Sequence, residues 1–384
     1  MRTSAISGFS RLSLEEKLQK AAEFANLDKD DLTLMETYRN LPDFTELENN
    51  LGPFKIATNF LVNGNDYLIP METEEPSVVA AASRIAKLAR LGGGFEGKYL
   101  CRRMIGQIQI LEVKDFEGAK RNILGEKEDL LKVANETNKF IFEHGGGAKE
   151  IEVRTVETEK GPHLGVYLSV DTLDAMGANI INTMLEAIAP KISEISGGSP
   201  NLKIVSNFAV RRVVSVECKI PVKKLAIGDF SGEEIAGRII MATAFAKADP
   251  FRGATHNKGA MNGIDAVLLA TGNDFRAVEA GVHAYAARSG KYTAITDYWR
   301  EEGNLCGKIE IPMPVGTVGG ATGLKKSRLA LKILGVKSAQ ELGAVVASVG
   351  LANNLAAMSA IVSEGIQKGH MRLHNSFIEN TAEK

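Results

Sequence analysis

A regular change of hydrophobic period between residues 103 and 221 constrains the fold more than any other feature of the sequence. Strand-like alternation and helix-like spacing follow one another over the stretches 103–113, 115–143, 149–157, 163–171, 178–196 and 202–221. The resulting order, β-α-β-β-α-β, is typical of the split βαβ or ferredoxin-like arrangement. The sequence therefore predicts an α+β fold, in which a small domain at 102–215 is inserted into a large mixed α/β domain formed by 1–101 and 216–366.

The N-terminal third shows ordinary signals of local structure. Residues 12–38 predict two short amphipathic helices, and 54–70 predict extended chain with a hairpin turn at 63–66. Pro76 then opens a predicted helix, which Gly92 ends.

The composition is that of a globular protein without a nucleic-acid partner. Among 384 residues, 46 basic and 47 acidic side chains leave a formal charge of −1, whereas nucleic-acid binders carry a clustered basic excess. The three cysteines, Cys101, Cys218 and Cys306, share no short spacing, so we expect neither disulfides nor a metal site. The histidines show no metal-ligand spacing either.

No segment predicts export or a membrane anchor. The N-terminus lacks the apolar run of a signal peptide. The most apolar stretch, 344–362, is interrupted by Asn353 and Asn354, and a membrane helix needs about 20 mostly apolar residues. We therefore expect a buried helix there and a cytoplasmic protein without membrane contact.

Two glycine-containing segments are candidates for nucleotide binding. Residues 92–97 fit the pattern G-x-G-x-x-G but follow a predicted helix, so a helix-ending turn is the better interpretation. Residues 174–179 lie between a predicted strand and a predicted helix, where free N–H groups and the helix dipole favour phosphate. A simple strand-to-helix turn is the alternative for this segment.

An acidic segment, 71–77, leads into the helix that starts at Pro76. Acidic residues commonly complement the dipole at a helix N-terminus, which is the structural interpretation. The functional interpretation is that Glu75 acts as an acid.

The segment 249–263 is the most unusual, because Arg, Thr, His, Asn and Lys side chains gather among glycines without helical or strand periodicity. It predicts a polar loop that binds a carboxylate and a polarised carbonyl. A second polar loop, 271–276, follows closely. Lys258 and Asp274 from these loops are expected to pair, either as a functional pair or as a simple ion pair.

Together these segments resemble the 3-hydroxy-3-methylglutaryl-CoA (HMG-CoA) reductase family, in particular its soluble class II enzymes of bacteria and archaea. The resemblance extends from about residue 49 to about residue 371. It is carried, in the family's order, by Glu74–Ser77, Asp174–Asn179, Ala254–Gly263, Gly272–Asp274 and Gly365–His370.

The resemblance implies the four-electron reduction of HMG-CoA to mevalonate and CoA, with two hydrides from NADPH or NADH. It implies a large substrate domain, a small NAD(P)-binding domain and, at 367–384, the start of a C-terminal flap. It also implies an obligate homodimer with active sites at the subunit interface, and leaves higher assembly open.

Residue roles follow from the same resemblance. Lys258 would stabilise the oxyanion, Glu75 would supply its proton, Asp274 would set the protonation of this pair, and His370 would protonate the departing thiolate. The implied substrate contacts are Ser77, Arg252, Thr255 and Asn262, and the implied cofactor contacts are Asp174, Met176, Gly177, Ala178 and Asn179.

Two positions depart from the family pattern. Only 14 residues follow His370, whereas class II members usually carry a longer helical tail. Asn138 falls where NAD-preferring members can place Asp. A neutral Asn beside Lys139 does not repel a 2′-phosphate, so the sequence favours NADPH over NADH.

Two other functions compete with this interpretation. Another NAD(P)H-dependent acyl-CoA reductase would use the same pocket, but Arg252 and Asn262 indicate a substrate with a free carboxylate. A non-catalytic CoA- or nucleotide-binding module would not need the combination of Lys258, Asp274 and Glu75.

Overall fold

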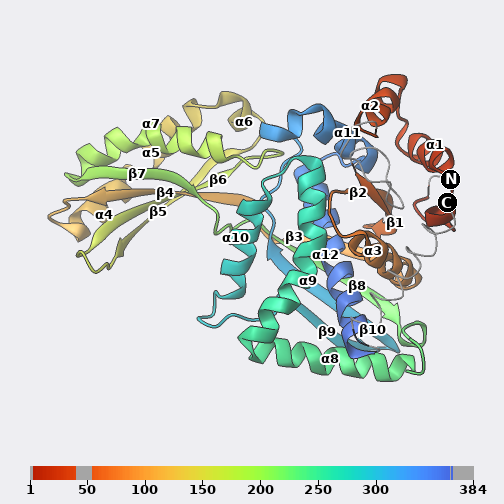
Figure 1. Cartoon of the computed structure of the whole chain (residues 1–384). Helices are drawn as coiled ribbons and strands as arrows, with labels where there is room; N and C mark the ends of the chain where they lie inside the picture. The colour runs from red at the N-terminus through yellow and green to blue at the C-terminus, as the bar shows by residue number, and fades with distance from the viewer. Residues whose placement is uncertain (1–2, 40–53, 364, 366–384) are drawn as a thin grey trace.

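The computed structural model describes residues 3–39, 54–363 and 365. Its strands form two separate sheets, of six and four strands, which lie in two bodies of different size (Figure 1). The mixture of helices and two sheets confirms the predicted α+β class.

The large sheet has the order β2-β1-β3-β8-β10-β9. Its strands are β1 (Lys55–Val62), β2 (Asn65–Met71), β3 (Phe95–Tyr99), β8 (Val213–Pro221), β9 (Thr296–Glu301) and β10 (Asn304–Pro312). The β1–β2 hairpin turns at Asn63 and Gly64, both with positive φ, as the turn signal predicts. Segments far apart in the sequence thus meet in one sheet, because β3 pairs with β8.

The small sheet is antiparallel, with the order β5-β6-β4-β7. Its strands are β4 (Arg103–Leu111), β5 (Gly147–Val156), β6 (His163–Asp171) and β7 (Ser199–Ser206). Helices α4 (Phe116–Gly125), α5 (Lys127–Glu136) and α7 (Ala178–Ser196) share its hydrophobic core, and α6 (Lys139–Glu143) is short. The predicted extended stretch 202–221 is divided between the sheets, so the expected boundary at 215 falls inside β8.

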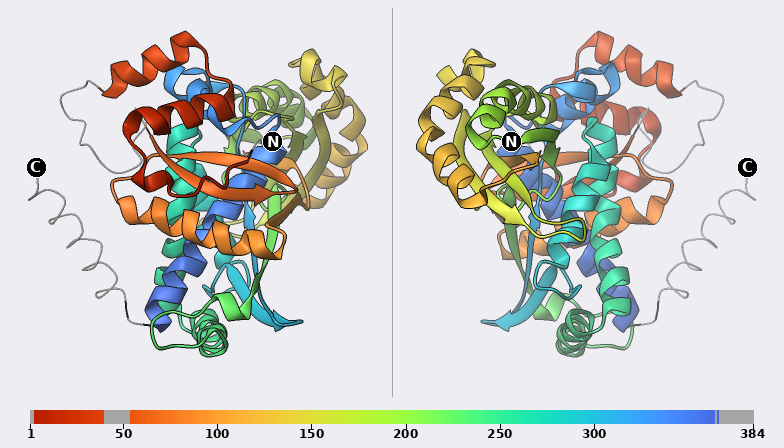
Figure 2. Two further views of the ribbon diagram at one scale, coloured as in Figure 1. Left: turned by 90° about the vertical axis from the view of Figure 1, so that its right-hand side faces the viewer. Right: turned by 90° about the vertical axis from the view of Figure 1, so that its left-hand side faces the viewer.

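The remaining helices surround the large sheet or cover its outer edge. They are α1 (Leu14–Ala25), α2 (Lys29–Arg39), α3 (Pro76–Ala89), α8 (Gly232–Ala248), α9 (Pro250–Thr271), α10 (Phe275–Ala286), α11 (Lys325–Leu334) and α12 (Ala339–Val362), with single 3-10 turns at Phe9–Arg11, Arg90–Gly92, Val222–Lys224 and Gly320–Gly323. Helices α1 and α2 lie outside the β1–β2 hairpin (Figures 1 and 2). Ser13 and Glu16 form a capping box at the start of α1.

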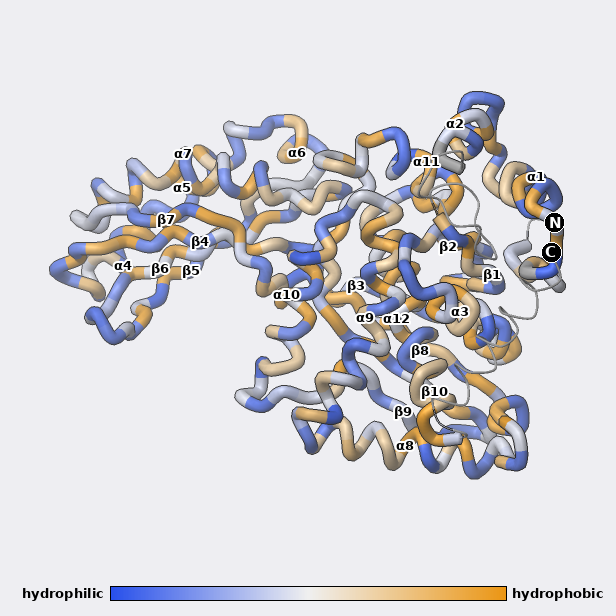
Figure 3. Tube along the Cα trace, viewed as in Figure 1, coloured by the Kyte–Doolittle hydropathy of each residue, from blue (hydrophilic) through white to orange (hydrophobic). Residues whose placement is uncertain are grey.

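Helix α12 is the central helix of the large body. It is long and apolar enough to cross a membrane by length and composition, but 78% of its most apolar window is buried inside the structure. Its apolar side chains belong to the same core as those of α3, α9 and the large sheet (Figure 3). The interpretation of 344–362 as a buried helix is therefore confirmed.

The prediction for 249–263 was wrong, because this segment forms the first turns of α9. The Asp249 side chain caps the helix by accepting from Arg252 N at 2.9 Å, and Pro250 suits the first turn. Its glycines do not mark a loop but allow close packing. A Cβ on Gly263 would lie 2.1 Å from Asn353 Oδ1 of α12.

Candidate active site

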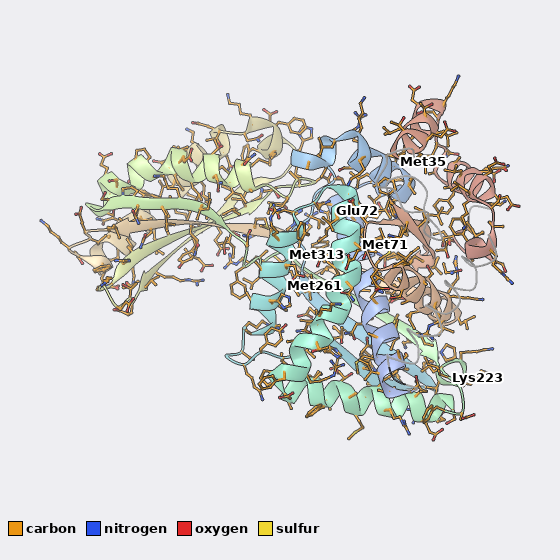
Figure 4. All side chains as sticks on the ribbon, in the orientation of Figure 1. Met35, Met71, Glu72, Lys223, Met261 and Met313 are labelled. Carbon is orange, nitrogen blue, oxygen red and sulfur yellow. The ribbon has the colours of Figure 1, made fainter. Side chains whose placement is uncertain are left out.

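The acidic loop at the start of α3 holds Glu75 at the N-cap, as predicted. The Glu75 carboxylate accepts from Ser77 N at 3.3 Å, and Thr73 Oγ1 accepts from Glu75 N. Glu72 N donates to Ala266 O at 2.8 Å, which attaches the loop to α9 (Figure 4 labels Glu72). Glu75 and Ser77 therefore belong to a loop that is fixed against α9.

Lys55 is the buried cation of this loop, and sequence analysis missed it. Its ammonium donates to Thr73 O. Burial lowers the pKa of Lys55, and the surrounding charges of Glu74, Glu72 and Glu75 oppose that shift. The acidic loop thus surrounds a positive charge from β1.

One face of α9 carries the side chains predicted to bind substrate. Thr255 and Lys258 are exposed and Asn262 is partly exposed, and their spacing of three and four residues places them on one stripe of the helix. Arg252, at the start of α9, is partly buried, and burial lowers its pKa. Its Nη2 lies 3.3 Å from Met358 Sδ.

The neighbouring His256 belongs to the core instead. It is buried, its Nε2 lies 2.6 Å from Thr296 Oγ1, and Asn354 Nδ2 donates to its carbonyl. Burial lowers the pKa of His256 to about 4, so the ring is neutral at pH 7. The polar residues of this segment therefore divide between substrate face and core.

A cavity of about 560 Å³ lies at the other end of α9. Its lining comes from three separate segments, residues 175–180, 269–276 and 316–322. It therefore unites the predicted cofactor segment with Asp274 and with a glycine-rich loop to which the sequence assigned no function. Gly316 is required here, because a Cβ would lie 2.7 Å from Met176 N.

Asp274 is the N-cap of α10, where its Oδ1 accepts from Ala277 N at 3.2 Å. Its side chain is 44% exposed. Asn273 fixes the preceding turn, because its buried Oδ1 accepts from Gly316 N at 2.8 Å. A carboxylate is thereby held at the wall of the cavity.

The start of α7 forms the opposite wall of this cavity and suits an anion. Gly177 precedes the helix with φ 96°, α7 has no side-chain cap, and its first turn contains no acidic residue. Ala178, Asn179 and Ile180 line the cavity. The first backbone N–H groups of a helix lack partners within it, so this end of α7 fits the phosphates of a dinucleotide.

Asp174 has a structural role in this site. Its Oδ1 accepts from Ala339 N at 2.7 Å, at the start of α12, and its carbonyl accepts from Thr317 N. It therefore anchors the loop to the large body.

A single chain does not bring Lys258 and Asp274 together. Leu269 lines the cavity, and a helical rise of about 1.5 Å per residue places Lys258 about 16 Å from it along α9. The expectation that the two residues lie on adjacent loops was wrong, because the helix separates them. We group Glu75, beside α9, with Lys258 and Asn262 on α9 as one candidate half-site, and Asp274 with residues 175–179 at the cavity as the other.

The two remaining predicted residues lie elsewhere. Asn138 is the N-cap of α6, where its Oδ1 accepts from Ile141 N at 3.1 Å, and it does not line the cavity. His370 and the rest of 366–384 lie outside the described residues.

A half-buried carboxyl pair on α9 and α10 also escaped sequence analysis. Asp265 shares a hydrogen bond with Glu279, and Glu279 Oε2 lies 2.7 Å from His283 Nε2. Burial and the adjacent Glu279 raise the pKa of Asp265 to about 8. No sequence pattern predicts this pair, because a turn separates the two residues and their spacing matches no motif.

This pair predicts an unusual dependence of stability on pH. Between about pH 4 and pH 8 the folded Asp265 holds a proton that the unfolded chain lacks, so the stability contributed by this group falls as pH rises from about 4 to about 8. We expect Asp265→Asn to raise the free energy of unfolding relative to the original chain by about 1–2 kcal/mol more at pH 9 than at pH 6. Urea unfolding at both pH values tests this, and a difference that does not change with pH would contradict it.

Comparison with known proteins agrees with this geometry. The sequence model of the family described as hydroxymethylglutaryl-coenzyme A reductase matches residues 14–375. The chain belongs to this oxidoreductase family. A 3-hydroxy-3-methylglutaryl-coenzyme A reductase of Archaeoglobus fulgidus is 50% identical over 97% of this chain and 86% of its own length.

More distant members of the reductase family also match almost the whole length of this chain. A probable 3-hydroxy-3-methylglutaryl-coenzyme A reductase of Borreliella burgdorferi is 36% identical over 95% of this chain and 84% of its own. Among solved structures, the class II reductase of Streptococcus pneumoniae bound to NADPH in open conformations superposes with a TM-score of 0.84. It is 40% identical, and the match covers 93% of this chain and 99% of that one. These comparisons confirm the predicted class II family.

Proposed function

We propose that this reductase reduces HMG-CoA to mevalonate and CoA with NADPH or NADH. The observation that carries the proposal is the cavity that joins Asp274 to the uncapped start of α7. Residues 177–180 would hold a dinucleotide phosphate at that helix end, and Asp274 lies in the wall of the same cavity. The membership of the family supplies the substrate class.

In this proposal the acidic loop and α9 act on the thioester carbonyl. A bound nicotinamide supplies hydride in each of two reductions. Lys258, exposed on α9, stabilises the negative charge that develops on the carbonyl oxygen. Glu75 delivers a proton to that oxygen, and Asp274 keeps Glu75 protonated because a second carboxylate disfavours its ionised form.

The free carboxylate and hydroxyl of the substrate are bound at the same half-site. The Arg252 guanidinium contacts Met358 Sδ, and within the described residues it makes no ion pair, so it is available for the substrate carboxylate. Thr255, Asn262 and Ser77 offer neutral hydrogen-bonding groups nearby. His370 would protonate the leaving thiolate.

The two half-sites require a second subunit. Because α9 separates Lys258 from Asp274 within one chain, we infer that a homodimer brings Lys258 of one subunit to Asp274 of the other. The stripe of α9 that carries Lys258 also exposes Phe251, whose exposed fraction is 88%. An apolar side chain of that exposure favours burial in an interface.

We assign the small domain, which contains β4 to β7, to cofactor binding and place the protein in the cytoplasm. Within that domain, NADPH is the favoured cofactor. Asn138 and the exposed Lys139 stand at the start of α6, and no carboxylate there would repel a 2′-phosphate.

A spectrophotometric assay separates the candidate functions. Oxidation of NADPH or NADH is followed at 340 nm with HMG-CoA, and with acetyl-CoA as the control thioester without a free carboxylate. We expect oxidation with HMG-CoA only, two cofactors per mevalonate, and higher kcat/KM with NADPH. Turnover of acetyl-CoA would favour a different acyl-CoA reductase, and binding without turnover would favour a non-catalytic module.

A further inference from the structure

Arg212 is a fully buried cation at the junction between the large body and the small body. It precedes β8, and its exposed fraction is 2%. Its guanidinium donates to five oxygen atoms, which are Thr172 Oγ1 (2.8 Å), Ala175 O (3.0 Å), Met176 O (3.3 Å), Leu173 O (3.5 Å) and Val315 O (2.8 Å). Four of these oxygen atoms belong to residues 172–176. The fifth belongs to Val315, which directly precedes the glycine-rich loop at 316–322.

These bonds hold two walls of the cavity together. Residues 175–180 line it on one side and residues 316–322 on the other. Arg212 is itself anchored, because its carbonyl accepts from Met313 N at 2.9 Å. Thr172 adds to these contacts, because its Oγ1 donates to Ala175 O at 2.7 Å and accepts from Arg212.

The positive charge of Arg212 is not neutralised by direct contact. Within the described residues, no carboxylate lies within salt-bridge distance of its guanidinium. The two nearest acidic groups are used elsewhere: Asp171 accepts from Leu173 N, and Asp174 accepts from Ala339 N. Burial lowers the pKa of Arg212, but an arginine keeps its charge.

We propose that Arg212 is a positioning residue for the cofactor: it fixes the width of the cavity between residues 172–176 and Val315, and places a buried positive charge behind the phosphate-binding end of α7. The inference rests on the proposed function. A planar fork with five donors can hold both walls at once, whereas a lysine with three donors cannot.

The test measures cofactor affinity apart from turnover. The Kd for NADPH is obtained from the fluorescence of the bound nucleotide, for the original chain and for Arg212→Met, Arg212→Lys and Thr172→Val. We expect the Kd to rise by about 10- to 100-fold in Arg212→Met. A smaller rise is expected in Arg212→Lys, which keeps the charge, and in Thr172→Val, which keeps the shape. The KM for HMG-CoA should stay within threefold.

The matched control is Arg211→Met. Arg211 adjoins Arg212 in sequence but pairs with Glu150 and Glu152 on the small sheet. The Kd of the Arg211→Met variant for NADPH should therefore stay within twofold of that of the original chain. Should Arg212→Met fail to fold by far-UV circular dichroism, Arg212→Lys and Thr172→Val carry the test.

Two outcomes would overturn the inference. One is an unchanged Kd for NADPH in the folded variants, and the other is an equal loss of affinity for both substrates, which indicates general loosening. If the original chain bound neither NADPH nor NADH, the proposed function itself would fail, so the two failures are distinguishable.

Discussion

Replacement of Lys258 by methionine is expected to lower kcat by about 10³-fold, with little change in the KM for HMG-CoA. Lys258 is exposed on α9, where its ammonium forms no ion pair within the described part of the chain. Its charge therefore contributes little to folding, and methionine preserves the length of the side chain. Loss of the charge should act mainly on the transition state, in which the carbonyl oxygen becomes negative.

Steady-state kinetics and thermal unfolding of Lys258→Met test this expectation. The control is Lys132→Met on α5, because Lys132 is also an exposed helical lysine and its helix does not line the cavity. Turnover by Lys258→Met within tenfold of the original chain would remove Lys258 from the oxyanion site.

Substitution of Asp274 by asparagine is expected to lower kcat by about 10²- to 10³-fold while substrate binding and stability hardly change. Asparagine caps a helix as well as aspartate does, so α10 keeps its N-cap bond to Ala277 N. The substitution therefore removes the charge and, with it, only the exposed ion pair between Asp274 Oδ1 and Arg276 Nη2 at 3.4 Å. Without the negative charge of Asp274, the ionised form of Glu75 is less disfavoured, so Glu75 holds its proton less well and delivers it less often.

The control for this variant is another capping aspartate. Asp115 caps α4 by accepting from Gly118 N at 2.9 Å, so Asp115→Asn makes the same chemical change at a helix of the small domain. Both variants should unfold at nearly the temperature of the original chain, and only Asp274→Asn should be slow. Equal turnover of the two variants would exclude Asp274 from proton transfer.

Local patterns predicted much of the fold, because the elements concerned follow ordinary rules of periodicity and capping. The helix predicted at 178–196 is α7 with the same bounds, and the strand predicted at 163–171 is β6. The prediction of a loop at residues 249–263 failed because the glycine and polar residues there lie in a helix and do not mark a loop. Gly263 allows α12 to approach α9, and His256 is a core residue, and neither property is visible in local sequence.

The candidate site was predicted in its parts but not in its arrangement. The resemblance identified residues 174–179 and Asp274, and the fold brings 175–179 and Asp274 to one cavity. It could not show that Lys258 lies within a helix of 22 residues, whose turns after Lys258 separate it from Asp274. Arg212 was missed because four of its five oxygen partners are backbone carbonyl groups, and backbone acceptors leave no signature in the sequence.

We infer that each active site combines Lys258 of one subunit with Asp274 of the other. Co-expression of Lys258→Met and Asp274→Asn chains, each inactive alone, tests it most directly. Random assortment makes about half of the dimers mixed, and each mixed dimer contains one intact site of two, so we expect about a quarter of the original activity. Activity that stayed at the level of the separate variants, despite mixed dimers shown by differently tagged chains, would contradict the claim.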